Sequence, residues 1–201
     1  MTHVSILISL SLLATGCTTA RLSGGPDVYA LAEHANALRM GVTQIVDERK
    51  SDHLGTVGAA GIRVRREDVT ELATNYLLHI LNAKMDTNVV RVNQVTPSDI
   101  PALVEREQID GVIVCRIKNL SLFSIDAIMQ PTKVEMDLEV EVYNRAGALM
   151  YSEIANGYYS KRIWPMTQNG AGKLVESAIQ DVMSKLAKDS YLKKSLTVVS
   201  A

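Results

Sequence analysis

Apolar and acidic residues alternate strictly from Val134 to Val142, within the segment 133–143 that reads KVEMDLEVEVY. Every even position from Val134 to Val142 is apolar, and every odd position from Glu135 to Glu141 is acidic. Because side chains alternate between the two faces of a strand, this pattern predicts a strand with one buried face and one solvated face. Residues 144–147 (NRAG) have the composition of a turn, so residues 149–161 are expected to return as a hairpin partner.

Two longer segments repeat apolar residues with the period of a helix. In residues 68–84, Asp68 stands three residues before Glu71, a variant of the capping box that predicts the start of a helix. The second segment runs from Leu174 to Leu186, after a break in the chain predicted at residues 169–172 (NGAG). Both segments are expected to form long amphipathic helices.

Shorter apolar segments complete the predicted order of elements. Residues 38–46 read as a strand, and the glycine-rich residues 55–64 are expected to pair back with it irregularly. A strand over 88–95 and a short helix over 97–108 precede residues 111–117, which are apolar enough for a central strand. Strands grouped in late hairpins, with helices set apart from them, predict an α+β fold with a mixed, mostly antiparallel sheet and two long helices packed on one face.

The beginning of the chain has the pattern of a targeting segment. The ten apolar residues Val4–Leu13 are too few to span a bilayer as a helix but match the apolar part of a signal peptide. The next four residues, Ala14-Thr15-Gly16-Cys17, resemble a bacterial lipobox, in which the chain is cut before a cysteine that carries diacylglycerol. The resemblance implies lipidation at Cys17, so that acyl chains such as palmitate anchor the chain in a membrane. The alternative is a buried first strand or helix with Cys17 in the core.

These features divide the chain into three parts. Residues 1–16 are predicted to be a signal peptide, residues 17–28 a lipidated N-terminus and flexible tether, and residues 29–197 a single periplasmic α+β domain. The tether is predicted because Thr, Ser, Gly and Pro dominate residues 18–27 (TTARLSGGPD). With Cys17 consumed, Cys115 is the only thiol left, so no intramolecular disulfide is expected.

Composition and motifs argue against several classes of function. A net charge of −1 and a pI near 6.4 argue against a nucleic-acid-binding protein. The four histidines lack the spacing of metal ligands, and the glycines of residues 55–61 lack the spacing of a dinucleotide-binding loop. We therefore predict no metal, no cofactor and no enzymatic activity. The acids of residues 135–141 are expected to form a solvated strand face or to meet a basic partner surface.

One further segment has the composition of a protein contact. Residues 162–166 combine Arg162, the only tryptophan (Trp164) and Met166, which are residue types enriched at binding hot spots. We predict that these three residues contact a partner. The alternative is that Trp164 closes one end of the hydrophobic core.

Taken together, the segments resemble the YajG-type lipoproteins, which are similar in fold to the N-terminal domain of TolB. The resemblance rests on the lipobox ending at Cys17, Asp47-Glu48-Arg49 at the end of an early strand, the helix 68–84, the strands near 110–117 and 133–143, and the closing sequence VESAIQDVMSKLAKDSYLKKSL. It implies a periplasmic α+β domain without enzymatic activity, and it supplies no functional residue besides the lipidated cysteine.

The resulting hypothesis is a lipid-anchored, non-catalytic accessory that binds or assembles with another envelope protein, either as a monomer or as a homo-oligomer. Thr18 follows the cysteine where lipoproteins retained in the inner membrane often carry Asp, which favours the periplasmic face of the outer membrane. The alternative function is a periplasmic carrier that holds a lipid or small ligand in an apolar groove between sheet and helices.

Overall fold

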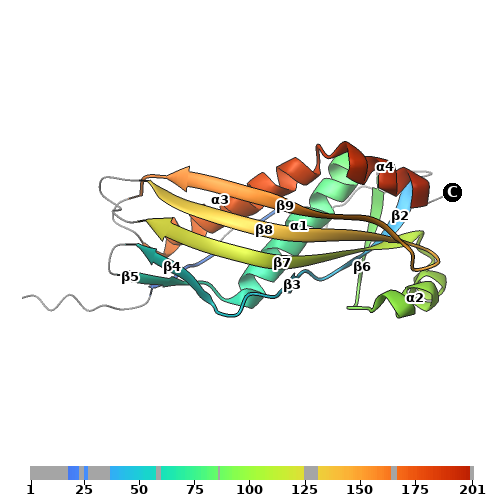
Figure 1. The fold of residues 1–201 in the computed structure, drawn as a ribbon, viewed down its shortest axis with the longest axis horizontal. Coiled ribbons are helices and arrows are strands. Elements are labelled where there is room, and N and C mark those ends of the chain that lie inside the picture. The colour runs from blue at the N-terminus through green and yellow to red at the C-terminus, as the bar shows by residue number, and fades with distance from the viewer. Residues whose placement is uncertain are drawn as a thin grey trace, which may run out of the picture.

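The computed structural model describes residues 18–22, 25–26, 37–57, 60–85, 87–124, 131–163 and 167–199. Within these ranges the chain forms nine strands and four α-helices (Figure 1). The strands are β1 (Thr18–Thr19), β2 (Leu38–Thr43), β3 (Val46–Asp47), β4 (His53–Val57), β5 (Ala60–Arg63), β6 (Thr87–Val92), β7 (Gly111–Ser124), β8 (Thr132–Asn144) and β9 (Leu149–Lys161). The helices are α1 (Arg66–Met85), α2 (Ile100–Glu107), α3 (Gln168–Leu186) and α4 (Ser190–Val199), and the short 3-10 helix η1 (Pro97–Asp99) precedes α2.

All the strands belong to one mixed sheet, in which β7 is central. β7 pairs in parallel with β2, β3 and β4, and it pairs antiparallel with β8, which in turn pairs antiparallel with β9. The three long strands β7, β8 and β9 run side by side along the length of the molecule (Figure 1). The predicted α+β class and mixed sheet are confirmed.

The prediction of a mostly antiparallel sheet holds for β7–β9 and for the β4–β5 hairpin only. The pairs β1–β5 and β2–β6 are parallel, as are those of β7 with β2, β3 and β4. Parallel neighbours need long connections, and here α1 and α2 lie in the connections that lead into β6 and β7. Local sequence patterns contain no information about this pairing.

The buried face of β8 is the one that the alternating sequence predicts. Val134, Met136, Leu138, Val140 and Val142 are all 0% exposed and belong to the main hydrophobic cluster. Both long helices contribute to this cluster: α3 contacts β8 and β9, whereas α1 contacts β6 and α3. The short helix α2 contributes instead to a second cluster, which it shares with alternate residues of β7. The packing of the two long helices on one face of the sheet stays a prediction.

The segment 55–64 differs from the prediction. It forms most of the β4–β5 hairpin, and β4 pairs with β7, so it does not pair with residues 38–46. The irregularity expected from its glycines is present at Gly55, where φ is +144° and the register with β5 shifts. A side chain at Gly55 would overlap the backbone carbonyl of Leu122.

The ends of the helices also differ from the sequence predictions. α1 begins at Arg66, so Asp68 lies inside the first turn and accepts hydrogen bonds from the Arg65 guanidinium instead of capping the helix. α3 begins at Gln168, although a break was predicted at 169–172. Thr167 caps α3 by accepting a hydrogen bond (3.0 Å) from the Gly170 N–H.

The second helix at the C-terminal end, α4, was not predicted. The carboxylate of Asp189 accepts hydrogen bonds from the N–H groups of Tyr191 (2.7 Å) and Leu192 (3.0 Å) and so caps its first turn. Leu192, Leu196 and Val199 recur at helical spacing and are buried in the main cluster. This spacing is the signal that the sequence analysis missed.

Candidate functional site

The residues directly after Cys17 are fixed to the domain. Cys17 itself lies outside the described residues, but Thr18 and Thr19 pair in parallel with Ile62 and Arg63 of β5. Ala20, which follows them, is 1% exposed and donates a backbone hydrogen bond (2.6 Å) to Arg63. These contacts differ from the flexible tether that composition predicts for this stretch.

A glycine on α3 makes room for the same segment. The N–H of Arg21 donates a hydrogen bond (3.2 Å) to the carbonyl of Gln168, at the first turn of α3. A Cβ at Gly172 would overlap the carbonyl oxygen of Arg21. Gly172 does not break the helix. The position requires glycine because the backbone of Arg21 passes directly against it.

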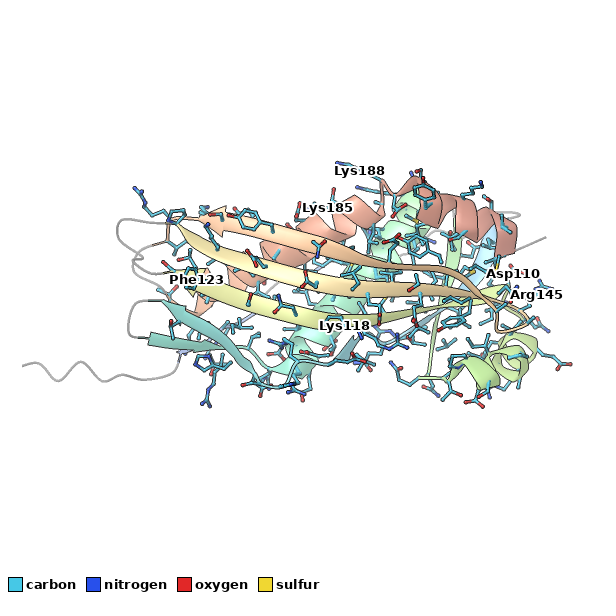
Figure 2. All side chains as sticks on the ribbon, in the orientation of Figure 1. Asp110, Lys118, Phe123, Arg145, Lys185 and Lys188 are labelled. Carbon is cyan, nitrogen blue, oxygen red and sulfur yellow. The ribbon has the colours of Figure 1, made fainter. Side chains whose placement is uncertain are left out.

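One end of the sheet is formed by the end of β7, the start of β8 and the end of β9. β7 runs to Ser124 at this end, where Phe123 pairs with Lys133 of β8 and Thr132 pairs with Lys161 of β9. Figure 2 shows Phe123 at this end of the long strands, and its side chain is 58% exposed. We call the surface formed by Phe123, Lys133, Lys161 and Lys173 the Phe123 end.

The N-terminal side of Thr18 is directed toward the same end. β4 is parallel to β7 and pairs Val57 with Ser124, and β5 returns from there starting at Ala60, which pairs with Val57. Because β1 is parallel to β5, the direction from Thr19 back to Thr18 leads toward the Phe123 end. The structure therefore brings the attachment point of residue 17 and the Phe123 end together.

The described part of the predicted contact segment, Arg162 and Ile163, borders this region. Arg162 is exposed and directly follows β9, while Trp164 and Met166 lie outside the described residues. A hollow of about 180 Å³ lies next to Arg162 between the end of β9 and α3; it is lined by Tyr159, Lys161, Ile163, Lys173, Leu174, Glu176, Ser177 and Gln180. The contact of these residues with a partner stays a prediction.

The acidic face of β8 is partly neutralised by the chain's own bases. Arg116 of β7 forms salt bridges with Glu139 (3.0 Å) and Glu141 (2.7 Å), and Lys118 bridges Glu48 (2.7 Å) and Glu139 (3.1 Å). Burial opposes ionisation of Glu139, but hydrogen bonds from Lys118 and Arg116 outweigh burial and lower the pKa of its carboxyl below the ordinary value. The face is therefore less acidic toward a partner than the sequence suggests.

The outer edge of β9 is closed in one half by α3. The backbone oxygen of Asn156 accepts a hydrogen bond (2.8 Å) from Lys185, and the N–H of Tyr158 donates one (2.8 Å) to Asp181. Asp181 and Lys185 also form an ion pair (2.8 Å). Burial opposes the charge of Asp181, but the hydrogen bonds that its carboxylate accepts from Lys185 and from the Tyr158 N–H outweigh burial and lower its pKa.

The other half of this edge is open. Backbone groups of a strand alternate in direction, so Ser152 and Ile154 point their N–H and C=O groups away from β8, as Asn156 and Tyr158 do. In the described part of the chain β9 has no second strand neighbour. A hollow of about 330 Å³ lies beside this half, lined by Met150, Tyr151, Ser152 and Glu153 of β9 and by Tyr191, Lys194, Ser195 and Val198 of α4.

Apolar side chains border the open edge. Tyr191 is 76% exposed, Ile154 is 51% exposed and Val198 is 45% exposed. We call Ser152 to Ile154 with Tyr191 and Val198 the β9–α4 edge. This surface was not predicted, because the helical spacing of α4 went unrecognised and because an open edge on β9 is a property of the whole sheet order.

The described residues include one free thiol, which lies in the core. Cys115 is fully buried, and burial raises the pKa of its thiol, so it is a poor nucleophile. No cluster of three or more His, Cys, Asp and Glu side chains in the described ranges could hold a metal ion. Among these same residues, no helix combines the length and apolar character needed to cross a bilayer.

Comparisons with known proteins give structural likeness without a family. No family model matches the chain, and no curated protein matches its sequence. Protein XCC0632 from Xanthomonas campestris, of family DUF330, is 10% identical, with a TM-score of 0.49 over 89% of this chain and 95% of that one. The PelC dodecamer from Paraburkholderia phytofirmans is 13% identical (TM-score 0.48, 83% and 93% covered), and lipoprotein GNA1162 from Neisseria meningitidis is 13% identical (TM-score 0.36, 76% and 99% covered). Likeness at this level assigns no function.

Proposed function

We propose that this chain is a bacterial lipoprotein, acylated at Cys17, whose domain binds another protein of the cell envelope without catalysing a reaction. The apolar run Val4–Leu13 and the lipobox-like residues 14–17 support the anchor. The residue that follows the cysteine, Thr18, supports the periplasmic face of the outer membrane as its location.

The observation that carries the binding role is the β9–α4 edge. An unpaired strand edge offers N–H and C=O groups to an added strand, and natural proteins usually close such edges. Here α3 closes the edge at Asn156 and Tyr158 but leaves Ser152 and Ile154 open. An extended segment of a partner could pair with the open half and place an apolar side chain against Tyr191 and Val198.

The carrier alternative receives no support from the described interior. A carrier needs an apolar groove between sheet and helices, whereas the inner face of β8 and the facing residues of α3, such as Val175, Ile179 and Val182, are 0% exposed. The side chains of this layer fill it.

Crosslinking in living cells tests the β9–α4 edge. A photoreactive p-benzoylphenylalanine in place of Tyr191 is expected to crosslink the full-length protein to one envelope protein. Ile154→Pro should reduce this crosslink about tenfold, because it removes an outward N–H without removing a bond to β8. Ile154→Thr keeps the N–H and should therefore retain the crosslink from position 191.

Placing the photoreactive residue at Glu71, an exposed position on α1, provides the control and should give no such crosslink. Equal crosslinking in the Ile154→Pro and Ile154→Thr variants would show that partners do not pair with this edge. The absence of any envelope crosslink from position 191 would contradict the binding role.

A further inference from the structure

We infer that the Phe123 end lies directly against the membrane, with Lys133, Lys161 and Lys173 facing the headgroups of anionic phospholipids. This inference rests on the proposed acylation of Cys17. It adds an orientation to the anchor, because a lipidated protein on a long tether would have no fixed surface toward the bilayer.

Only a short length of chain separates the proposed lipid on Cys17 from the folded domain. A flexible tether of ten residues has an end-to-end distance of about 18 Å, which lets a domain turn freely. Here Thr18 is already paired with Ile62, so a single peptide unit of about 3.8 Å separates the Cα of Cys17 from the sheet. Acyl chains on Cys17 would therefore hold this part of the domain at the membrane surface.

The register of the strands shows at which end of the sheet Thr18 lies. Thr18 is opposite Ile62, which is opposite Gly55, which is opposite Leu122 on β7. Thr18 therefore lies one residue short of the level of Phe123, and its N-terminal side is directed toward the end of β7. The anchor and the Phe123 end thus lie at the same height on the sheet, and the membrane that receives the acyl chains meets both.

The Phe123 end presents an exposed aromatic ring and several lysine side chains. The exposed ring of Phe123 pairs across the strands with the exposed Lys133, and Lys161 and Lys173 line the neighbouring hollow between β9 and α3. Each lysine close to an anionic leaflet adds to the electrostatic attraction between the protein and the membrane. Phe123 and Lys133 lie on the outer face of the sheet, whereas Lys161, opposite the buried Thr132, lies on the helix side with Lys173. An anionic bilayer that meets the end of the sheet would contact the apolar ring and the lysines of both faces.

The opposite end of the domain differs in charge. There Arg145, in the turn between β8 and β9, forms a salt bridge with Asp110, so its charge is neutralised within the domain (Figure 2). This end therefore provides the reference position for a measurement of orientation.

Spin labels on the full-length, lipidated protein in vesicles test the inference. Lys133→Cys places a label at the Phe123 end, and Ala146→Cys places one in the turn at the opposite end. Cys115 is buried and Cys17 acylated, so the label reacts only with the new thiol. In vesicles of phosphatidylethanolamine and phosphatidylglycerol, collisions of the label at 133 with a water-soluble nickel chelate should fall at least threefold relative to position 146.

Charge variants separate the lysines from the anchor. Lys161→Glu combined with Lys173→Glu should remove most of the protection at 133, whereas the control pair Lys84→Glu and Lys193→Glu, two exposed lysines elsewhere, should leave it unchanged. Equal collision rates at 133 and 146 on a vesicle-bound protein would overturn the orientation alone. A protein that carries no acyl group and does not bind vesicles would overturn the proposed function itself.

Discussion

Replacing Gly157 by Val is expected to lower the free energy of unfolding by about 2–3 kcal/mol, the size of a strong overpacking effect. Gly157 lies on β9 where α3 crosses it, and a Cβ there would stand 2.5 Å from the carbonyl oxygen of Ala178 and 3.0 Å from the Cβ of Val182. The first of these atoms is backbone, so the contact cannot be relieved by a rotamer change. The helix has to move away from the sheet, which opens the main cluster.

Urea unfolding followed by circular dichroism measures this effect. For a domain of this size the loss corresponds to a fall in Tm of roughly 5–10 °C. Ser152→Val, at an exposed position on the same strand, is the matched control and should change stability by less than about 0.5 kcal/mol. If Gly157→Val changed the free energy of unfolding by no more than this control does, α3 would not pack on β9 as described.

Gly172→Ala is expected to detach the segment after Cys17 from the domain while leaving the rest folded. The added methyl group would overlap the carbonyl oxygen of Arg21, so residues 18–22 must move away from α3. The same methyl group favours the helix itself by roughly 1 kcal/mol, because Ala has a higher helix propensity than Gly. Global stability should therefore change little, although the local structure of the segment is lost.

Hydrogen exchange resolves these two effects. The amides of Ala20 and Arg21 donate to Arg63 and Gln168 only when the segment is docked, so their protection should fall at least tenfold in Gly172→Ala. Amides of β8 should keep their protection. Gly170→Ala, in the first turn of the same helix, is the control. Unchanged protection of Ala20 and Arg21 would show that the segment is not held at Gly172.

The sequence predicts elements best where burial follows a local period. Strict alternation from Val134 to Val142 predicts both the strand β8 and its buried face, and helical spacing predicts most of α1 and α3. The predicted central strand ends at Ile117, whereas β7 continues to Ser124. The prediction stops early because the register with β8 shifts by one residue between Ile117 and Asn119, which interrupts the alternation of buried and exposed residues. After this shift Leu120 and Leu122 return to the buried face, which a fixed period of two does not anticipate.

Tertiary contacts explain the features that sequence patterns misassign. Gly170 and Gly172 suggest a break in the chain, yet both lie in α3, where the Arg21 backbone requires a glycine at position 172. Thr18 to Leu22 have the composition of a tether, yet the first two residues of this segment extend the sheet beside β5. No local pattern reports that a distant strand is available as a partner.

Only part of the candidate site can be predicted from local sequence motifs. Cys17 and Arg162 were identified from local motifs, and the structure places the described neighbours of both at the Phe123 end. The β9–α4 edge was not identified, because an open edge is a property of the whole sheet order and of side chains on α3 that reach Asn156 and Tyr158. Edge strands of this kind are recognised only once all pairings are known.

Intact mass spectrometry of the mature protein, purified from native membranes, tests the lipid anchor most directly. The account predicts a chain that begins at Cys17 and carries a diacylglyceryl group on its thiol and an acyl chain on its amino group. An unmodified chain that begins at Met1 would contradict the anchor, and with it the orientation of the Phe123 end toward the membrane.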